Sequence, residues 1–256
     1  MKIAIVTGAS SGMGRELLRQ LPDWEKYDEI WAIARRAEQL ESLKEEISLP
    51  IRPIPMDLTA PDSRERYRDL LRFAHPQVDL LANVSGFGKF GSYKDIPLDD
   101  SLNMIDLNVK ALVWVTEETI PYLGEEGKIL QWDSMSAIQP VPYLNVYAAT
   151  KAFVLSYSRA LNRELAPTGR KCMAVCPYWV KTPFFDRARE TNAKAVTVFN
   201  RTYAAKDVVN TALNDLFNKN KDVSVHGKAM KWQWLLVKLL PHKTVMNTWL
   251  KQQKKA

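Results

Sequence analysis

The N-terminal segment places the strongest constraint on the fold of this chain. Residues 2–7 are an apolar run typical of a buried strand, a loop with Gly8, Gly12 and Gly14 follows, and a helical pattern begins at residue 15. This order predicts a turn whose backbone approaches a dinucleotide pyrophosphate at a helix N-terminus. The spacing is Gly-x-x-x-Gly-x-Gly, and a tight turn that binds nothing remains the alternative for this segment alone.

Apolar runs and helical patterns alternate through the rest of the chain. Strands are expected at 29–34, 51–56, 78–84, 128–133, 171–176 and 222–225, and helices at 61–74, 98–122, 145–166 and 206–219. Such alternation predicts an α/β fold: a doubly wound parallel sheet of the Rossmann type, flanked by helices. The composition shows no break, so residues 1–256 are expected to form a single domain with a core over 2–225 and a C-terminal extension over 226–256.

Hydropathy and cysteine content limit the class of protein. No apolar run reaches the ~18 residues that a membrane span needs, and the N-terminus lacks the layout of a signal peptide. Cys172 and Cys176, the only cysteines, share one apolar run, which favours a reducing, cytoplasmic compartment. The three histidines have no metal-ligand spacing, so no metal site is expected.

The net charge of +7 belongs to the C-terminal extension. No acid follows Asp222, whereas seven lysines do: Lys228, Lys231, Lys238, Lys243, Lys251, Lys254 and Lys255. Pro241 is expected to divide the extension into two short helices. The extension is either a basic amphipathic segment for an anionic membrane surface or, the interpretation favoured here, one that packs beside a substrate lid or a partner subunit. Nucleic-acid binding is not expected, because the basic face is confined to one tail.

A hydroxyl, a phenol and an ammonium follow the predicted strand over 128–133. Tyr147 and Lys151 are four residues apart, so they share one face of the predicted helix. The ammonium is expected to lower the pKa of Tyr147 from about 10, which would make the phenol a usable proton donor. Ser134 leaves the strand end and could reach the same point. Taken alone, the Tyr-x-x-x-Lys pattern is more often a stacked surface pair.

The end of the second strand bears on cofactor choice. In dinucleotide-binding folds an acid near this point takes the ribose 2′-hydroxyl, whereas an arginine suits a 2′-phosphate. Here the strand ends in Ala34-Arg35-Arg36 without an acid, which favours NADP(H) over NAD(H). Arg35 is assigned to the phosphate, and Arg36 to the solvated face of the next helix.

Taken together and in order, these segments resemble the classical short-chain dehydrogenases/reductases over residues 2–225. The resemblance is carried by the following pieces: Thr7-Gly8-x-x-x-Gly12-x-Gly14, Asp57, Asn83-Val84-Ser85-Gly86, Asn108, Ser134, Tyr147-x-x-x-Lys151 and Pro177-x-x-x-x-Thr182.

The resemblance implies a role for each matching position. Tyr147 would be the acid/base, Ser134 would hydrogen-bond the substrate oxygen, Lys151 would bind the nicotinamide ribose, and Asn108 would hold a water joined to Lys151. The implied cofactor-binding residues are Gly8, Ser10, Gly12, Met13, Gly14, Arg35, Asp57, Leu58, Asn83, Tyr147, Lys151, Val180 and Thr182. A homodimer or homotetramer, paired through helices 98–122 and 145–166, is also implied.

Two departures from the family pattern affect the pocket. Tyr178 stands where the family has glycine, so it either narrows the pocket or contacts the substrate. Ser11 stands where NADP-dependent members carry a basic residue, so NADP preference rests on Arg35. The pocket is expected to be bordered mainly by aromatic and apolar residues: Phe87, Met135, Tyr143, Tyr178, Trp179 and 184–199.

These patterns predict an NADP(H)-preferring oxidoreductase. It would interconvert a carbonyl and a secondary alcohol on a hydrophobic small molecule by hydride transfer, with Tyr147 as acid/base. The alternative is a non-catalytic NAD(P)-binding sensor or scaffold on the same fold, whose signature would be a broken Ser–Tyr–Lys set. Here Ser134, Tyr147 and Lys151 are all present.

Overall fold

A seven-stranded parallel sheet forms the centre of the computed structural model, which describes residues 1–191 and 194–253. The strand order is β3-β2-β1-β4-β5-β6-β9. The strands are β1 (Lys2–Thr7), β2 (Glu29–Ala34), β3 (Ile51–Pro55), β4 (Gln77–Asn83), β5 (Leu123–Trp132), β6 (Lys171–Val175) and β9 (Val223–Ser224). The chain winds outward in both directions from β1 and β4, so the predicted doubly wound fold is confirmed.

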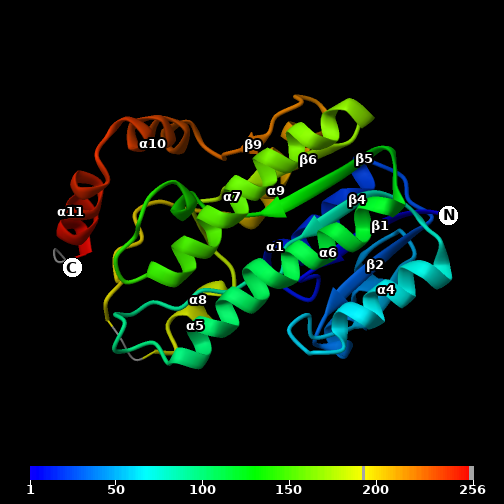
Figure 1. Cartoon of the computed structure of the whole chain (residues 1–256), viewed down its shortest axis with the longest axis horizontal. Helices are drawn as coiled ribbons and strands as arrows, with labels where there is room; N and C mark the ends of the chain where they lie inside the picture. The colour runs from blue at the N-terminus through cyan, green and yellow to red at the C-terminus, as the bar shows by residue number, and fades with distance from the viewer. Residues whose placement is uncertain (192–193, 254–256) are drawn as a thin grey trace.

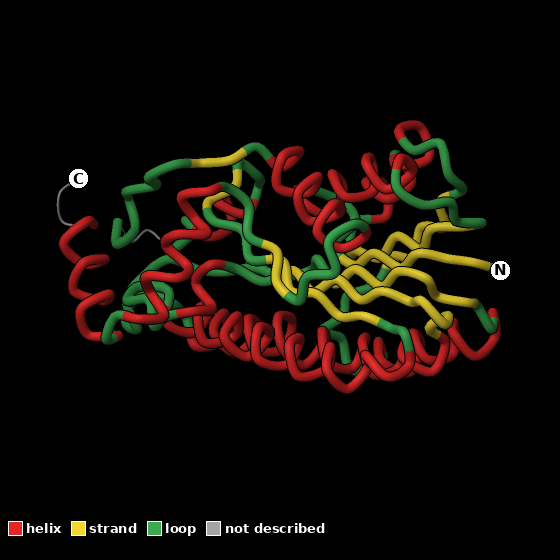
Figure 2. Tube along the Cα trace, turned by 90° about the horizontal axis from the view of Figure 1, so that it is seen from above, coloured by secondary structure: helices red, strands yellow, loops and turns green. Residues whose placement is uncertain are grey.

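Helices cover both faces of the sheet (Figures 1 and 2). One face packs on α1 (Gly12–Gln20), α2 (Ala37–Glu41), α3 (Leu43–Glu46) and α9 (Ala205–Phe217). The other packs on α4 (Ser63–Ala74), α6 (Leu112–Thr119) and α7 (Asn145–Leu165). Alternate strand residues serve the two faces: Ala4 and Val6 face the first layer, whereas Ile3 and Ile5 face the second.

The predicted helix over 98–122 is an unbroken run of four helical segments. It begins as α5 (Leu98–Ile105), becomes a π-helical segment (Asp106–Ala111), continues as α6, and ends in a 3-10 turn (Ile120–Tyr122). Single π segments of this kind often mark functional positions. This one contains Asn108.

Other boundaries differ locally from those predicted. β5 begins five residues before residue 128. β3 contains Pro53 and Pro55 because it is an edge strand, where the outward side of the backbone has no neighbouring strand to hydrogen-bond. Short elements that were not predicted are α8 (Phe184–Ala188), a two-stranded pair of β7 (Trp179–Val180) and β8 (Thr202–Tyr203), and 3-10 turns at Leu21–Asp23, Met135–Ile138 and Ala166–Thr168.

The C-terminal extension forms α10 (Lys228–Leu239) and α11 (His242–Gln253), separated at Pro241 as predicted. The two helices lie at the end of the molecule opposite the N-terminus (Figure 1). The Trp249 indole on α11 donates to the Pro142 carbonyl at 3.0 Å, and the Gln253 side chain accepts from the amides of Thr197 and Val198. α11 therefore closes over the segment after α8. Among the described residues, no helix is long and apolar enough to cross a bilayer.

Candidate active site

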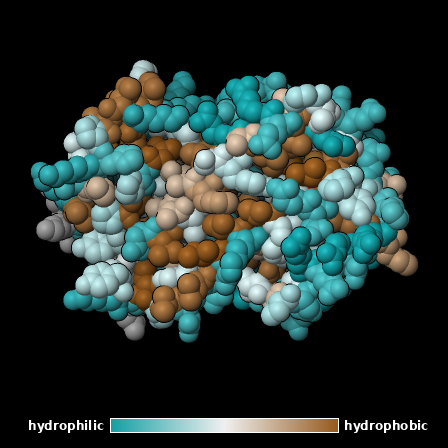
Figure 3. Space-filling model, in the orientation of Figure 1, coloured by the Kyte–Doolittle hydropathy of each residue, from teal (hydrophilic) through white to brown (hydrophobic). Residues whose placement is uncertain are grey.

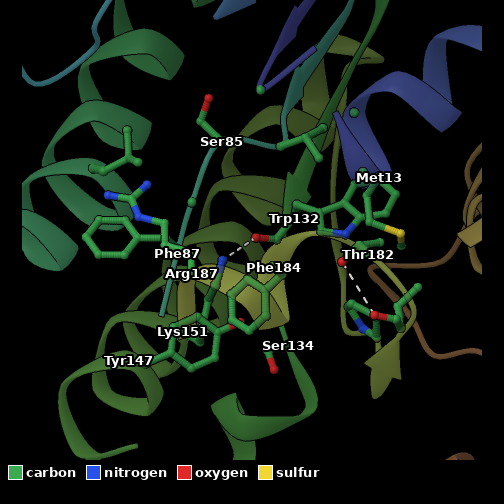
Figure 4. Close-up of a pocket in the computed structure, with 18 of the residues that line it drawn as sticks. Met13, Ser85, Phe87, Trp132, Ser134, Tyr147, Lys151, Thr182, Phe184 and Arg187 are labelled. Atoms are coloured by element: carbon green, nitrogen blue, oxygen red, sulfur yellow. Dashed lines mark hydrogen bonds between the residues drawn. The ribbon is translucent and has the colours of Figure 1, made fainter. Parts of the chain in front are cut away.

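One cavity of about 600 Å³ lies at the carboxyl ends of the central strands, beside the switch point between β1 and β4. Ser134, Tyr147 and Lys151 line it (Figure 4). Every residue predicted to bind the cofactor except Asn83 also lines it: Gly8, Ser10, Gly12, Met13, Gly14, Arg35, Asp57, Leu58, Tyr147, Lys151, Val180 and Thr182. The fold thus brings segments far apart in the sequence to one place.

The glycine loop forms one wall of the cavity. Gly8 and Gly12 have φ values of +69° and +55°, which side-chain-bearing residues rarely adopt. Gly14 lies against the Gly8 carbonyl too closely for a Cβ atom, so α1 can start directly beside β1. The first turn of α1 carries no acidic residue, and no side chain among the described residues caps this helix. Free N–H groups at this helix end fit a nucleotide phosphate.

The Arg36 side chain contacts the glycine loop. The Arg36 guanidinium donates to the hydroxyls of Ser10 and Ser11 at 3.0 and 2.8 Å. Arg36 is exposed at the start of α2, as predicted, but its guanidinium also contacts the glycine loop, which was not predicted. Arg35 also lines the cavity, is 61% exposed at its side chain, and lies 3.9 Å from the Asp57 carboxylate. Two guanidinium groups thus border the same corner of the cavity.

Tyr147 and Lys151 lie on the first two turns of α7, and both are buried. The Lys151 ammonium is 5.8 Å from the centre of the Tyr147 ring and donates to the Trp132 carbonyl at 2.6 Å (Figure 4). Ser134 caps the 3-10 turn after β5 from the residue before it, and its hydroxyl accepts from the Ser136 amide at 3.1 Å. The three side chains that the sequence singled out open on one cavity.

The expected effect of Lys151 on Tyr147 is not what the structure shows. Burial raises the pKa of the Tyr147 phenol; hydrogen bonding with Ser134 opposes that rise, and the carboxyl of Asp133 adds to it. Burial also lowers the pKa of Lys151. The prediction that the ammonium lowers the Tyr147 pKa overlooked the burial of both groups, which disfavours their charged forms.

The two predicted asparagines lie behind the cavity wall. Asn108 is fully buried; its amide donates to the Phe87 carbonyl and to Thr150, and its oxygen accepts from the Phe87 amide. It therefore fixes the loop after β4 against α7. Asn83 donates to Thr116 and Gln131, which ties β4 to α6 and β5. Neither residue lines the cavity.

A comparison with protein families decides the family of this chain. A family model described as short chain dehydrogenase matches residues 2–193. The chain belongs to the short-chain dehydrogenase family. The predicted family and the predicted class of enzyme, an NAD(P)-dependent oxidoreductase, are thereby confirmed.

Relatives of this short-chain dehydrogenase include a named reductase. It is 34% identical over 190 residues to sulfoacetaldehyde reductase 2 of Chromohalobacter salexigens, which covers 71% of this chain and 74% of that protein. It is 30% identical over 189 residues to a protein of Staphylococcus epidermidis described as an uncharacterized oxidoreductase, covering 71% and 79% of the two chains. Both alignments leave out more than a quarter of this chain.

Solved structures share its fold over nearly the whole chain. A short-chain dehydrogenase from Sphingobium yanoikuyae in complex with NADPH has a TM-score of 0.78 at 24% identity and covers 96% of each chain. A 7β-hydroxysteroid dehydrogenase has a TM-score of 0.79 at 18% identity and covers 97% of this chain and 96% of its own.

The sequence reasoning missed a buried acid in this short-chain dehydrogenase. Asp133, directly before Ser134, lines the cavity and is 2% exposed. Its Oδ2 atom accepts from the Cys176 thiol at 3.4 Å, and its Oδ1 atom has no partner among the described residues. Burial raises the pKa of this carboxyl, although the charge of Lys151 opposes the rise. The sequence offered one signal for this residue, because Asp133 ends the apolar run over 128–133.

The outer wall of the cavity is mostly aromatic, as predicted. Its members include Phe87, Met135, Tyr178, Trp179, Phe184 and Phe185, together with Gln233 and Trp249 from the extension. The Phe184 ring lies 5.5 Å from the Tyr147 ring, centre to centre. Tyr143 does not line the cavity; its carbonyl accepts from the Gly91 amide. Of the described residues in the predicted stretch 184–199, Phe184, Phe185 and Arg187 line the cavity and the others do not. Residues 192 and 193, part of the predicted border, lie outside the described residues.

A third arginine, also missed, approaches from α8. The Arg187 guanidinium carbon lies 3.5 Å from the centre of the Phe87 ring, and the residue lines the cavity. Burial lowers the pKa of Arg187, and the charge of Arg35 lowers it further. The charges of Arg35 and Arg187 are thus close enough to influence each other, and both also act on the Asp57 carboxylate.

Proposed function

We propose that this enzyme is an NADP(H)-preferring oxidoreductase that interconverts a hydrophobic carbonyl compound and its secondary alcohol. The observation that carries the proposal is the meeting of Ser134, Tyr147 and Lys151 with the glycine loop in one cavity. The aromatic outer wall supports an apolar substrate, because its rings offer contact area and few polar groups.

Each polar side chain then has a role at a stated atom. The Tyr147 phenol gives a proton to the substrate oxygen in reduction and takes it back in oxidation. Its high pKa suits the donor role, since the neutral form persists at neutral pH. The Ser134 hydroxyl donates a hydrogen bond to the same oxygen and stabilises its developing charge. Lys151 binds the ribose of the nicotinamide cofactor, which supplies or accepts the hydride.

The preference for NADP(H) rests on the arginines. Arg36 is held by two serine hydroxyls beside the glycine loop, so little side-chain freedom is lost when it binds an anion. Arg35 adds a second, exposed guanidinium. Asp57, the acid near this corner, is occupied by the Thr59 amide and hydroxyl. A ribose 2′-phosphate fits these groups better than a 2′-hydroxyl does.

Cofactor preference is tested by titrating the protein with NADPH and NADH while following its tryptophan fluorescence. NADPH is expected to bind at least about tenfold tighter, a difference of roughly 1.4 kcal/mol. Arg36→Ala should remove most of that difference without weakening NADH binding, and Arg35→Ala should remove less. Arg66→Ala, on the exposed side of α4, serves as the control. Equal binding of the two cofactors by the wild type would refute the preference but not the reaction.

The reaction is tested with NADPH and a panel of hydrophobic ketones. Tyr147→Phe is expected to abolish turnover while the protein still binds NADPH, because the substitution removes the hydroxyl that transfers the proton and leaves the other residues of the cofactor cleft in place. Turnover by Tyr147→Phe at the wild-type rate would contradict the assigned role. Cofactor binding without turnover of any carbonyl or alcohol would favour the sensor or scaffold alternative. The cytoplasmic location and the homodimer or homotetramer remain predictions.

A further inference from the structure

Helix α10 has two apolar faces, and only one of them packs against the protein. Met230 and Val237 are buried, and Met230 packs with Met135 and Val225. The opposite side carries an exposed stripe, defined here as Trp232, Leu235, Leu236 and Leu239, which are 66%, 49%, 53% and 75% exposed. Their spacing of three, four and seven residues places them on one face of the helix.

The exposed stripe is an apolar surface that is unusual on the solvent-facing side of a helix. A helix that packs on one side of a globular protein normally presents polar residues to solvent on the other. Here four large apolar side chains are contiguous, and Leu240 extends them by one residue at 45% exposure. Figure 3 shows hydrophobic atoms gathered over α10 at one end of the molecule. Contiguous apolar surface of this kind marks an interaction site.

The charges around the stripe indicate what covers it. Lys228, Lys231 and Lys238 on α10 and Lys243 just after it are all exposed. Within residues 1–191 and 194–253, none of these lysines forms an ion pair, and no acidic residue follows Asp222 in the whole sequence. The occupant must therefore be apolar where it meets the leucines and negative where it meets the lysines.

An anionic lipid surface meets both conditions, whereas a second copy of α10 would bring like charges together. We propose that α10 lies in the plane of an anionic membrane surface, with the exposed stripe at the boundary between headgroups and acyl chains and the lysines at the phosphates. This placement is independent of the proposed reaction. Gln233, on the same helix, lines the cavity, so a membrane bound here would lie beside the outer wall of the cleft.

Vesicle co-sedimentation of the full-length protein tests this proposal. The wild type is expected to pellet with vesicles of phosphatidylcholine and phosphatidylglycerol, much less with phosphatidylcholine alone, and less at high salt. Leu235→Gln/Leu239→Gln and Lys231→Gln/Lys238→Gln should each weaken binding by about tenfold or more. The matched control is Leu98→Gln/Leu102→Gln, two exposed leucines at the same spacing on α5, which should bind as the wild type does.

A second readout locates the helix in the bilayer. Brominated lipids quench tryptophans that reach the acyl region, so part of the fluorescence should be quenched in the wild type and not in Trp232→Phe. Three results would overturn the proposal. They are a wild type that stays in the supernatant at low salt, equal loss of binding in the α5 control, and a dimer in sedimentation equilibrium that Leu235→Gln/Leu239→Gln converts to monomer. The last would assign the stripe to a second copy.

Discussion

The absence of a side chain at Gly88 leaves room for the Tyr147 ring in its observed position. A Cβ atom at Gly88 would lie 2.8 Å from Cδ2 and 3.0 Å from Cγ of Tyr147, and 3.0 Å from the Phe184 ring. Ordinary carbon contacts are about 3.7 Å, so Gly88→Ala must displace the Tyr147 ring by roughly 0.9 Å and also press on the Phe184 ring. The backbone at Gly88 does not have positive φ, so alanine brings no other strain.

A displacement of this size is expected to act on catalysis more than on stability. A misplacement of about 1 Å in a catalytic group can cost about 100-fold in rate, and overpacking costs about 1–3 kcal/mol. For Gly88→Ala we expect kcat/KM to fall by about two orders of magnitude, Tm to fall by a few degrees, and the Kd for NADPH to stay unchanged. Steady-state kinetics with a ketone substrate, thermal unfolding and fluorescence titration measure the three quantities.

The matched control is Gly124→Ala. There a Cβ atom would meet the Asp79 carboxylate at 2.6 Å, a closer approach than at Gly88, but the atom belongs to the end of a flexible side chain far from the cavity. Activity should survive in this variant. A folded Gly88→Ala enzyme with kcat/KM within about threefold of the wild type would refute the idea that ring position limits the rate.

Three further outcomes are expected. Burial raises the pKa of Asp133 to about 8, so between the unfolded value of 3.8 and this value the folded state holds a proton that the unfolded chain releases. The folded state is therefore destabilised as pH rises through this range. The Tm of Asp133→Asn should exceed that of the wild type by a margin that grows from about pH 5 to about pH 8. A margin that shrinks over this range in differential scanning fluorimetry would contradict the prediction. NADPH at about 100 times its Kd should stabilise the fold by about 2.7 kcal/mol, seen as a rise in Tm, and an unchanged Tm would argue against binding. Phe184→Ala should raise KM for hydrophobic ketones about tenfold and leave NADPH affinity unchanged, because the ring packs on Tyr147 at the substrate end of the cleft.

The sequence predicts the parts of this fold that depend on local pattern. β1 and β2 begin and end at the predicted residues, because each is a short run with a buried apolar centre between polar neighbours. Ser134, Tyr147 and Lys151 were predicted to meet, since a strand end followed by a helix leaves few other arrangements. The π-helical turn at Asn108 was not predicted, because its sequence is compatible with an ordinary α-helix.

Properties that depend on tertiary packing were beyond the sequence. The contacts of Arg36 with Ser10 and Ser11 were not predicted, because they depend on the extended backbone of this residue at the start of α2. The sign of the Tyr147 pKa shift was wrong because the depth of burial is not visible in a four-residue spacing. The extension was expected to pack, and α11 does. On α10, however, both faces are apolar, so periodicity alone could not tell which one meets the protein.

The position of the outer wall in the sequence affects how substrate specificity can evolve in this family. The family model ends at residue 193, whereas Gln233 and Trp249 on that wall come from beyond it. The side chains that we propose to handle the proton all lie inside the matched part. Evolution can therefore rebuild what the cleft admits by altering the last quarter of the gene while the reaction machinery stays as it was. A substrate assigned to any relative that aligns only with the matched part is a weak guide to the molecule that this chain accepts.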